Sequence, residues 1–195
     1  MKKSGDTIAA PIVELGERLV TVLERASIPS GLKDEKELER HFVLREVEKI
    51  LQGSGEKFDV CAHPWNSEDC CPKHKGVRQS LGCPECWRGS KPWASVHMWG
   101  MQHNFDLAIR DQKVIEDSLV VETKLVSFES GQPNGDVQRL FGQCSLAKTK
   151  HKIVIGFCAY RGTLREKFPQ DKQDTSAAMR WFKEIGVKVV FRKIE

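Results

Sequence analysis

The chain has 195 residues, of which 39% are hydrophobic and 30% are charged, and its net charge is +4. This composition is typical of a globular protein and excludes a disordered or fibrous chain. The length suffices for a sizeable core, so we expect a single domain over residues 1–195. The mildly basic charge permits a polyanionic partner but does not require one.

No run of apolar residues approaches the length of a transmembrane helix, so no membrane partner is expected. Two lysines open the chain, but Glu14, Glu17 and Arg18 interrupt the apolar residues that a secretory signal would need. We therefore expect an intracellular, cytoplasmic protein. Seven cysteines in such a protein indicate metal binding before disulfides.

Two helices are predicted at the start of the chain, over residues 7–26 and 34–53, because apolar residues recur at helical spacing in both. Asp34 is a good N-cap for the second helix, and Gly53 suits its end. The segment 57–65 is typical of a short strand.

Residues 61–99 show little periodicity and hold a cluster of cysteines and histidines among prolines and tryptophans. Cys71 and His74 form one ligand pair, and Cys83 and Cys86 form another, each spaced by two residues. Two tight turns of this kind complete a tetrahedral structural zinc site, which folds a segment with little core of its own. The sequence thus predicts a zinc-binding insertion with these four ligands.

Other roles for the thiols stay open. Three neighbouring residues could replace one zinc ligand: Cys61, His63 and Cys70. The CxxC inside the cluster also occurs in thiol-redox enzymes, but here no strand and helix flank it and a second ligand pair accompanies it. Cys144 and Cys158 lie in apolar surroundings and are expected to be ordinary core residues.

The C-terminal half alternates between strand and helix. Strands are predicted over 103–110, 118–126, 152–160 and 187–194, and helices over 136–150 and 174–186. Such alternation gives right-handed crossovers, so the later strands should be largely parallel. The predicted fold class is α/β, with a mixed central sheet flanked by helices and a zinc-binding insertion.

The strand LVVETKLV, residues 119–126, holds Glu122 and Lys124 two positions apart, so both side chains point to one face. A hairpin between strands can bring Asp106 close to Glu122. Two carboxylates at adjacent strand ends suit Mg²⁺, which polarises a phosphate and lowers the pKa of a bound water. Lys124 would position that water or stabilise the developing charge. A solvent-facing ion pair between Glu122 and Lys124 is the alternative.

This order of elements, an acidic helix, a strand with Asp106, Glu122–Thr123–Lys124 and a βαβ crossover, resembles the PD-(D/E)xK, or restriction-endonuclease-like, nuclease superfamily. The resemblance covers roughly residues 34–158, although Phe105 stands where many members have proline. It implies a restriction-endonuclease-like sheet, Mg²⁺ or Mn²⁺ held by Asp106 and Glu122, and Lys124 as the catalytic lysine.

The resemblance also implies a catalytic glutamate on the preceding helix. The apolar neighbours rank Glu39 first, then Glu35 and then Glu46, although the surface at the edge of the apolar stripe is the usual place for all three. Many members carry a polar residue on the helix after the lysine strand. Gln138 and Gln143 are candidates, and an ordinary surface role suits both equally well.

Together these features predict a Mg²⁺-dependent endonuclease that hydrolyses phosphodiester bonds in nucleic acid, with DNA expected before RNA and a homodimer as an open possibility. The basic, tryptophan-rich insertion would contact the substrate, because aromatic faces stack on bases and basic side chains contact phosphates. The alternative is a non-catalytic zinc module on a nuclease-like scaffold that binds nucleic acid or protein. Such a module has no reason to keep Asp106, Glu122 and Lys124 together.

Overall fold

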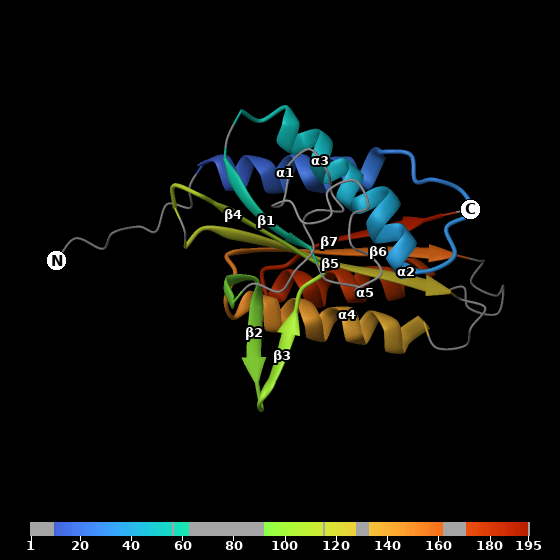
Figure 1. Ribbon diagram of the computed structural model, residues 1–195. Coiled ribbons are helices and arrows are strands. Elements are labelled where there is room, and N and C mark those ends of the chain that lie inside the picture. The colour runs from blue at the N-terminus through green and yellow to red at the C-terminus, as the bar shows by residue number, and fades with distance from the viewer. Residues whose placement is uncertain are drawn as a thin grey trace.

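The structure, a computed structural model, describes residues 10–55, 57–62, 92–114, 116–127, 133–161 and 171–194. A five-stranded mixed sheet lies at its centre, with helices on both faces (Figure 1). Among the helices in these ranges, none is both long enough and apolar enough to cross a membrane.

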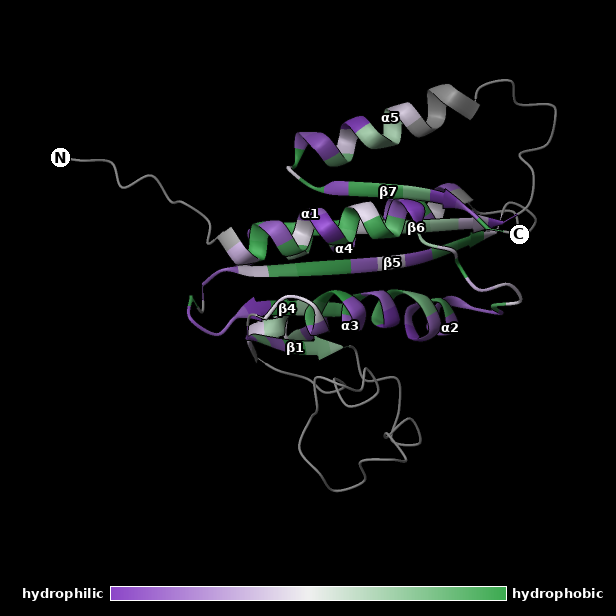
Figure 2. Cartoon of the chain, turned by 90° about the horizontal axis from the view of Figure 1, so that it is seen from above, coloured by the Kyte–Doolittle hydropathy of each residue, from purple (hydrophilic) through white to green (hydrophobic). Residues whose placement is uncertain are grey.

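The strands of the central sheet follow one another in chain order. They are β1 (Phe58–Ala62), β4 (Leu107–Asp111), β5 (Ser118–Ser127), β6 (Ile153–Arg161) and β7 (Lys188–Lys193). β4 runs antiparallel to both its neighbours, whereas β5, β6 and β7 are parallel, which confirms the predicted parallel C-terminal half. Figure 2 shows the strands side by side in this order, with the central ones largely hydrophobic.

One face of the sheet is covered by α1 (Ala10–Arg25) and by a helical segment that begins at α2 (Glu35–Leu38) and ends with α3 (Leu44–Gln52). The apolar stripe predicted for the first helix is buried against the sheet, with Ile12, Leu19 and Leu23 fully enclosed. The other face is covered by α4 (Pro133–Lys148) and α5 (Asp171–Glu184). Two hydrophobic clusters therefore sandwich the sheet.

The second predicted helix is not regular throughout. Asp34 caps it as predicted, since its carboxylate accepts a hydrogen bond from the Glu37 backbone N–H at 2.9 Å. Between α2 and α3, however, the chain forms a π-helical turn over Glu39–Val43. This wider turn is rare and is often found at functional sites. Apolar periodicity does not reveal it, because the buried stripe continues on both sides.

The segment 103–110, predicted as one strand, belongs to two sheets. β3 (Met101–Asn104) pairs with β2 (Ser95–Met98) in a separate hairpin, which follows a short 3-10 turn at Pro92–Ala94. The chain then bends at Asp106 and enters the central sheet as β4. The prediction was wrong at this point because the break lies at a polar residue inside a pattern that is otherwise strand-like.

Candidate active site

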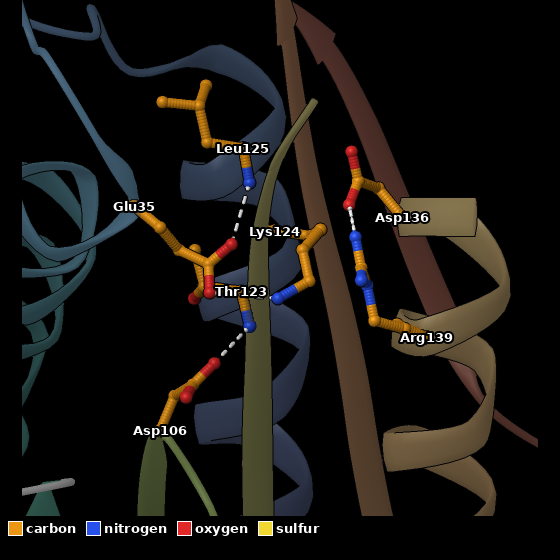
Figure 3. A network of polar contacts seen from close by, with 7 residues as sticks. All are labelled: Glu35, Asp106, Thr123, Lys124, Leu125, Asp136 and Arg139. Carbon is orange, nitrogen blue, oxygen red and sulfur yellow. Dashed lines mark hydrogen bonds and ion pairs between the residues drawn. The ribbon is translucent and has the colours of Figure 1, made fainter. Parts of the chain in front are cut away.

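The site forms where β5 extends beyond β4. The β4–β5 pairing ends at Leu107 and Val121, whereas β5 continues beside β6 as far as Ser127. Two backbone N–H groups on this uncovered edge donate to side-chain carboxylates in place of a strand's carbonyls (Figure 3). Thr123 donates to Asp106 at 2.6 Å, and Leu125 donates to Glu35 at 3.2 Å. The open edge of β5 thus gathers two acidic side chains from distant elements.

Asp106 and Glu122 lie together. Asp106 immediately precedes Leu107, the register partner of Val121, so it stands opposite Glu122 across the strands. The two carboxyl groups interact, and the Asp106 backbone N–H also donates to Glu122. Glu122 is only 1% exposed. The pair predicted from the two strands is therefore adjacent, with Glu122 buried and Asp106 partly buried.

Lys124 points to Glu35 rather than forming a solvent-facing pair with Glu122. Its Nζ lies 2.9 Å from Glu35 Oε1, and the lysine side chain is 14% exposed (Figure 3). Glu35 therefore contacts both the lysine amine and the backbone N–H of the next residue, Leu125. The alternative of a surface ion pair between Glu122 and Lys124 was wrong, because Glu122 is buried.

The three helical glutamates have different surroundings. Glu39, ranked first, is 6% exposed at the start of the π-helical turn, and its negative charge contributes to raising the pKa of Glu122. Glu35, ranked second, contacts Lys124. Glu46 instead pairs with Lys49, 2.5 Å away on the same helix. Both Glu35 and Glu39 thus lie at the site, and sequence spacing alone did not predict that two glutamates would contribute.

Burial dominates the acid–base properties of the cluster. Burial, supported by the charge of Glu35, raises the pKa of Asp106 to about 7, against the opposing hydrogen bond from Thr123. Burial and the neighbouring Asp106 raise the pKa of Glu122 well above its usual range. Burial lowers the pKa of Lys124, but the hydrogen bond and charge of Glu35, together with the charges of Asp106 and Glu122, outweigh this effect, so the net shift is upward. The lysine is therefore a cation at neutral pH, beside carboxyl groups that resist ionisation.

One carboxylate oxygen of Glu122, Oε1, is buried without a hydrogen-bond partner in the described part of the chain. A buried carboxylate oxygen without a partner is costly, and a bound cation would satisfy it. Two oxygen-bearing carboxylates with raised pKa values are a donor set that suits a hard divalent ion.

The site provides an incomplete shell for such an ion. Within the described ranges, no three His, Cys, Asp or Glu side chains form a ready metal-binding group. Mg²⁺ needs fewer protein ligands, because it keeps several waters and is commonly held by one or two carboxylates. Asp106 and Glu122 would hold it, and the charge of Glu39 lies close enough to favour it.

The helix α4 lies against the other side of β5. Cys144 is buried there, and the charges of Glu122 and Asp106 add to burial in raising its thiol pKa. Cys158 is also buried, which confirms both cysteines as core residues. Asp136, paired with Arg139 in the first turns of α4, adds to burial in raising the pKa of Cys158 to about 12 (Figure 3). Both thiols are therefore un-ionised and unreactive at neutral pH.

The two glutamines proposed on α4 differ in exposure. Gln138 faces solvent. Gln143 is half-buried, and its Oε1 atom is buried without a hydrogen-bond partner among the described residues. Gln143 therefore does not have the surroundings of an ordinary surface amide, whereas Gln138 does.

The predicted zinc ligands Cys71, His74, Cys83 and Cys86 lie outside the described residues, as do the alternatives His63 and Cys70. Cys61 is described and lies buried in β1, opposite Ala108 of β4. Its place in the central sheet gives it a structural role in the core, whatever ligands the insertion provides.

Comparisons of the chain with protein-family models, with curated proteins and with solved structures find no match. The functional interpretation therefore depends on the residues and geometry described above.

Proposed function

We propose that the chain is a metal-dependent nuclease that hydrolyses phosphodiester bonds in nucleic acid, with DNA as the first substrate to test. The observation that carries the proposal is the adjacent Asp106–Glu122 pair, with an unpartnered oxygen on the buried Glu122 and with Lys124 on the same stretch of β5. Paired carboxyl groups with raised pKa values, next to a lysine, are the kind of cluster that is often found at active sites.

The fold supports the same proposal. A mixed sheet flanked by helices, with an antiparallel β4–β5 pair and a parallel β5–α4–β6 crossover, agrees with the restriction-endonuclease-like arrangement that the sequence resemblance implies. In this arrangement Asp106 immediately precedes β4, Glu122 lies on the adjacent strand β5, and Glu35 and Glu39 come from the preceding helical segment.

Each group has a distinct role in the proposed reaction. Asp106 and Glu122 would hold Mg²⁺ or Mn²⁺, which when bound supplies Lewis-acid activation of the phosphate and of a water. Lys124, kept protonated by Glu35, would stabilise the negative charge that develops on the phosphate oxygens as water attacks phosphorus and the P–O bond breaks. Its raised pKa favours this electrostatic role over that of a general base.

The test is a cleavage assay on single- and double-stranded DNA and RNA with Mg²⁺, with Mn²⁺ and with EDTA. We expect cleavage only with a divalent ion, and losses of at least about 100-fold in Glu122→Gln and in Lys124→Ala. Glu46→Gln is the matched control, because it neutralises a glutamate that pairs with Lys49.

Full cleavage by both site variants would refute the catalytic assignment. Metal-independent binding without cleavage, in every substrate class, would favour the alternative of a non-catalytic binding module. A structural zinc ion in the insertion remains part of the proposal, on the strength of the two ligand pairs in the sequence.

A further inference from the structure

The hairpin of β2 and β3 stands apart from the central sheet. Its strands pair only with each other in the described structure, and the hairpin projects from the body of the molecule (Figure 1). Its base is anchored: Lys150 Nζ lies 2.6 Å from the Ser95 carbonyl oxygen, and the Arg110 guanidinium stacks on Trp93 at 4.7 Å. The hairpin is therefore held at its base, and its turn lies away from the hydrophobic core.

The tip of the hairpin is apolar and exposed. Trp99 is 93% exposed, Met101 is 63% exposed and Met98 is 36% exposed. These three residues, here called the hairpin tip, form a cluster of large hydrophobic side chains that are exposed to solvent. Exposed apolar clusters of this kind mark interaction sites.

The backbone conformation of Trp99 is also unfavourable for a residue with a bulky side chain. Trp99 has a φ of 50° and is followed by Gly100 with a φ of 78°, so both central residues of the turn are left-handed. Turns of this type favour Asn–Gly or Asp–Gly, since a bulky side chain is strained there. A tryptophan that is both strained and exposed weakens the fold, which indicates that it is present for a function.

The chemistry of the hairpin favours a nucleic acid as its partner. Residues 92–105 contain no Asp or Glu, and their only titratable side chains are His97 and His103. The hairpin therefore carries no carboxylate that would repel phosphates. An exposed indole presents a flat face, and base–aromatic stacking tolerates any sequence because every base has a π-face.

The hairpin is also joined directly to the candidate active site. β3 ends at Asn104, and only Phe105 separates it from Asp106. Asp106 follows Trp99 by seven positions, so the backbone between these two residues reaches at most about 23 Å at about 3.3 Å per residue. Consecutive nucleotides of a stacked strand are about 3.4 Å apart, so this reach spans about six nucleotides.

We propose that the hairpin tip stacks on an unpaired base of the nucleic-acid substrate, no more than about six nucleotides from the scissile phosphate. This inference rests on the proposed nuclease function and adds a contact that positions the substrate. Trp99 would provide the stacking face, and Met98 and Met101 would exclude water around it.

The test measures the affinity of the full chain for a fluorescently labelled single-stranded DNA oligonucleotide in EDTA, so that binding is separated from cleavage. Trp99→Asn should weaken binding by about 5- to 100-fold, the range that loss of one stacked base gives. Trp99→Phe should retain most of the affinity. Trp181→Ala is the control, since Trp181 is another half-exposed tryptophan, packed edge-on against Phe141.

The unfolding temperature of each variant shows whether a loss of affinity comes from a lost contact or from misfolding. Because Asn suits the left-handed turn, Trp99→Asn should unfold at the same temperature as the wild-type chain or at a higher one. Unchanged affinity in Trp99→Asn, with a wild-type chain that binds and cleaves, would overturn the inference but leave the proposed function intact. If the wild-type chain were a dimer that Trp99→Asn converts into monomers without changing the affinity for DNA, the inference would also be overturned. The tip would then contact a second copy of the chain. A wild-type chain that neither binds nor cleaves would overturn both proposals.

Discussion

At the scale of single residues, the site is defined by carboxyl groups that are more easily protonated in the folded chain than in the unfolded one. The pKa of Asp106 rises from 3.8 to about 7, and that of Glu122 also rises. A carboxyl with a raised pKa binds more protons in the folded state, so in the absence of metal it lowers stability as pH rises from about 4 through 7. Ionisation of these carboxyl groups therefore lowers the stability of the metal-free chain.

Glu122→Gln should therefore stabilise the metal-free protein. The amide removes a buried charge and cannot ionise, so we expect a gain of about 1–3 kcal/mol in the free energy of unfolding at pH 8 and little change at pH 4. Denaturant unfolding in EDTA at both pH values measures it, with Glu46→Gln as the control. An equal loss of stability at both pH values would contradict the prediction. Adding Mg²⁺ should stabilise the wild-type chain and not the variant.

Glu35 should influence activity through Lys124. Its hydrogen bond and charge are the principal causes that raise the pKa of the lysine, so Glu35→Gln should lower that pKa. The alkaline limb of the pH profile of kcat/KM should then shift to lower pH, while the zinc content stays the same. An unshifted profile with a uniformly lower kcat would instead mean that Glu35 only supports the fold of the β5 edge.

At the scale of elements, the sequence allowed the strands and helices of the central sheet to be located to within a few residues. Their buried apolar patterns were strong, as in β6, where residues 154–159 are all buried. The predictions were wrong where a polar group decides the local geometry. The π-helical turn at Glu39 and the bend at Asp106 each place a carboxylate at the site, and neither changes the apolar periodicity around it. The proximity of Asp106 and Glu122 was predictable from strand order, but the contact between Glu35 and Lys124 was not.

His151, which lies just before β6, has a lowered pKa, so its effect on stability changes with pH in the opposite direction to that of Asp106 and Glu122. Ser118 begins β5, and its Oγ lies 2.8 Å from Nδ1 of His151, which is 2% exposed and packs edge-on against Phe105. Burial, with the charge of Lys150, lowers the pKa of His151 from 6.5 to about 4. A group with a lowered pKa that is buried neutral stabilises the fold above about pH 6.5, and this stability is lost as pH falls towards 4.

His151→Gln should remove this acid sensitivity. The glutamine keeps a hydrogen-bonding group for Ser118 but does not titrate, so the variant should lose less stability than the wild type between pH 6.5 and 4, by at most about 3 kcal/mol. Denaturant unfolding across this range in EDTA would measure the difference. A parallel pH dependence in both proteins would contradict a buried neutral His151. The Glu122→Gln background separates this effect from the carboxylates, whose pH dependence runs the other way.

At the scale of the whole molecule, apolar packing stabilises the central sheet, whereas zinc is predicted to stabilise the insertion. The described ranges form two hydrophobic clusters on either side of one sheet, which hold the candidate active site at the edge of β5. The insertion between β1 and β2 has little apolar periodicity, so a metal would be needed to fold it.

The zinc ion is the last prediction, and it separates the two kinds of stabilisation. Elemental analysis of the purified wild-type chain should find about one zinc per chain, because four protein ligands fill a tetrahedral structural site. Cys83→Ser should lose the zinc and become more sensitive to proteolysis between β1 and β2. Cys158→Ala should lose stability through a cavity in the core but keep its zinc, since Cys158 is buried in β6. A well-folded wild-type chain without zinc, or a Cys83→Ser variant that retains it, would show that the cysteine pairs serve another purpose.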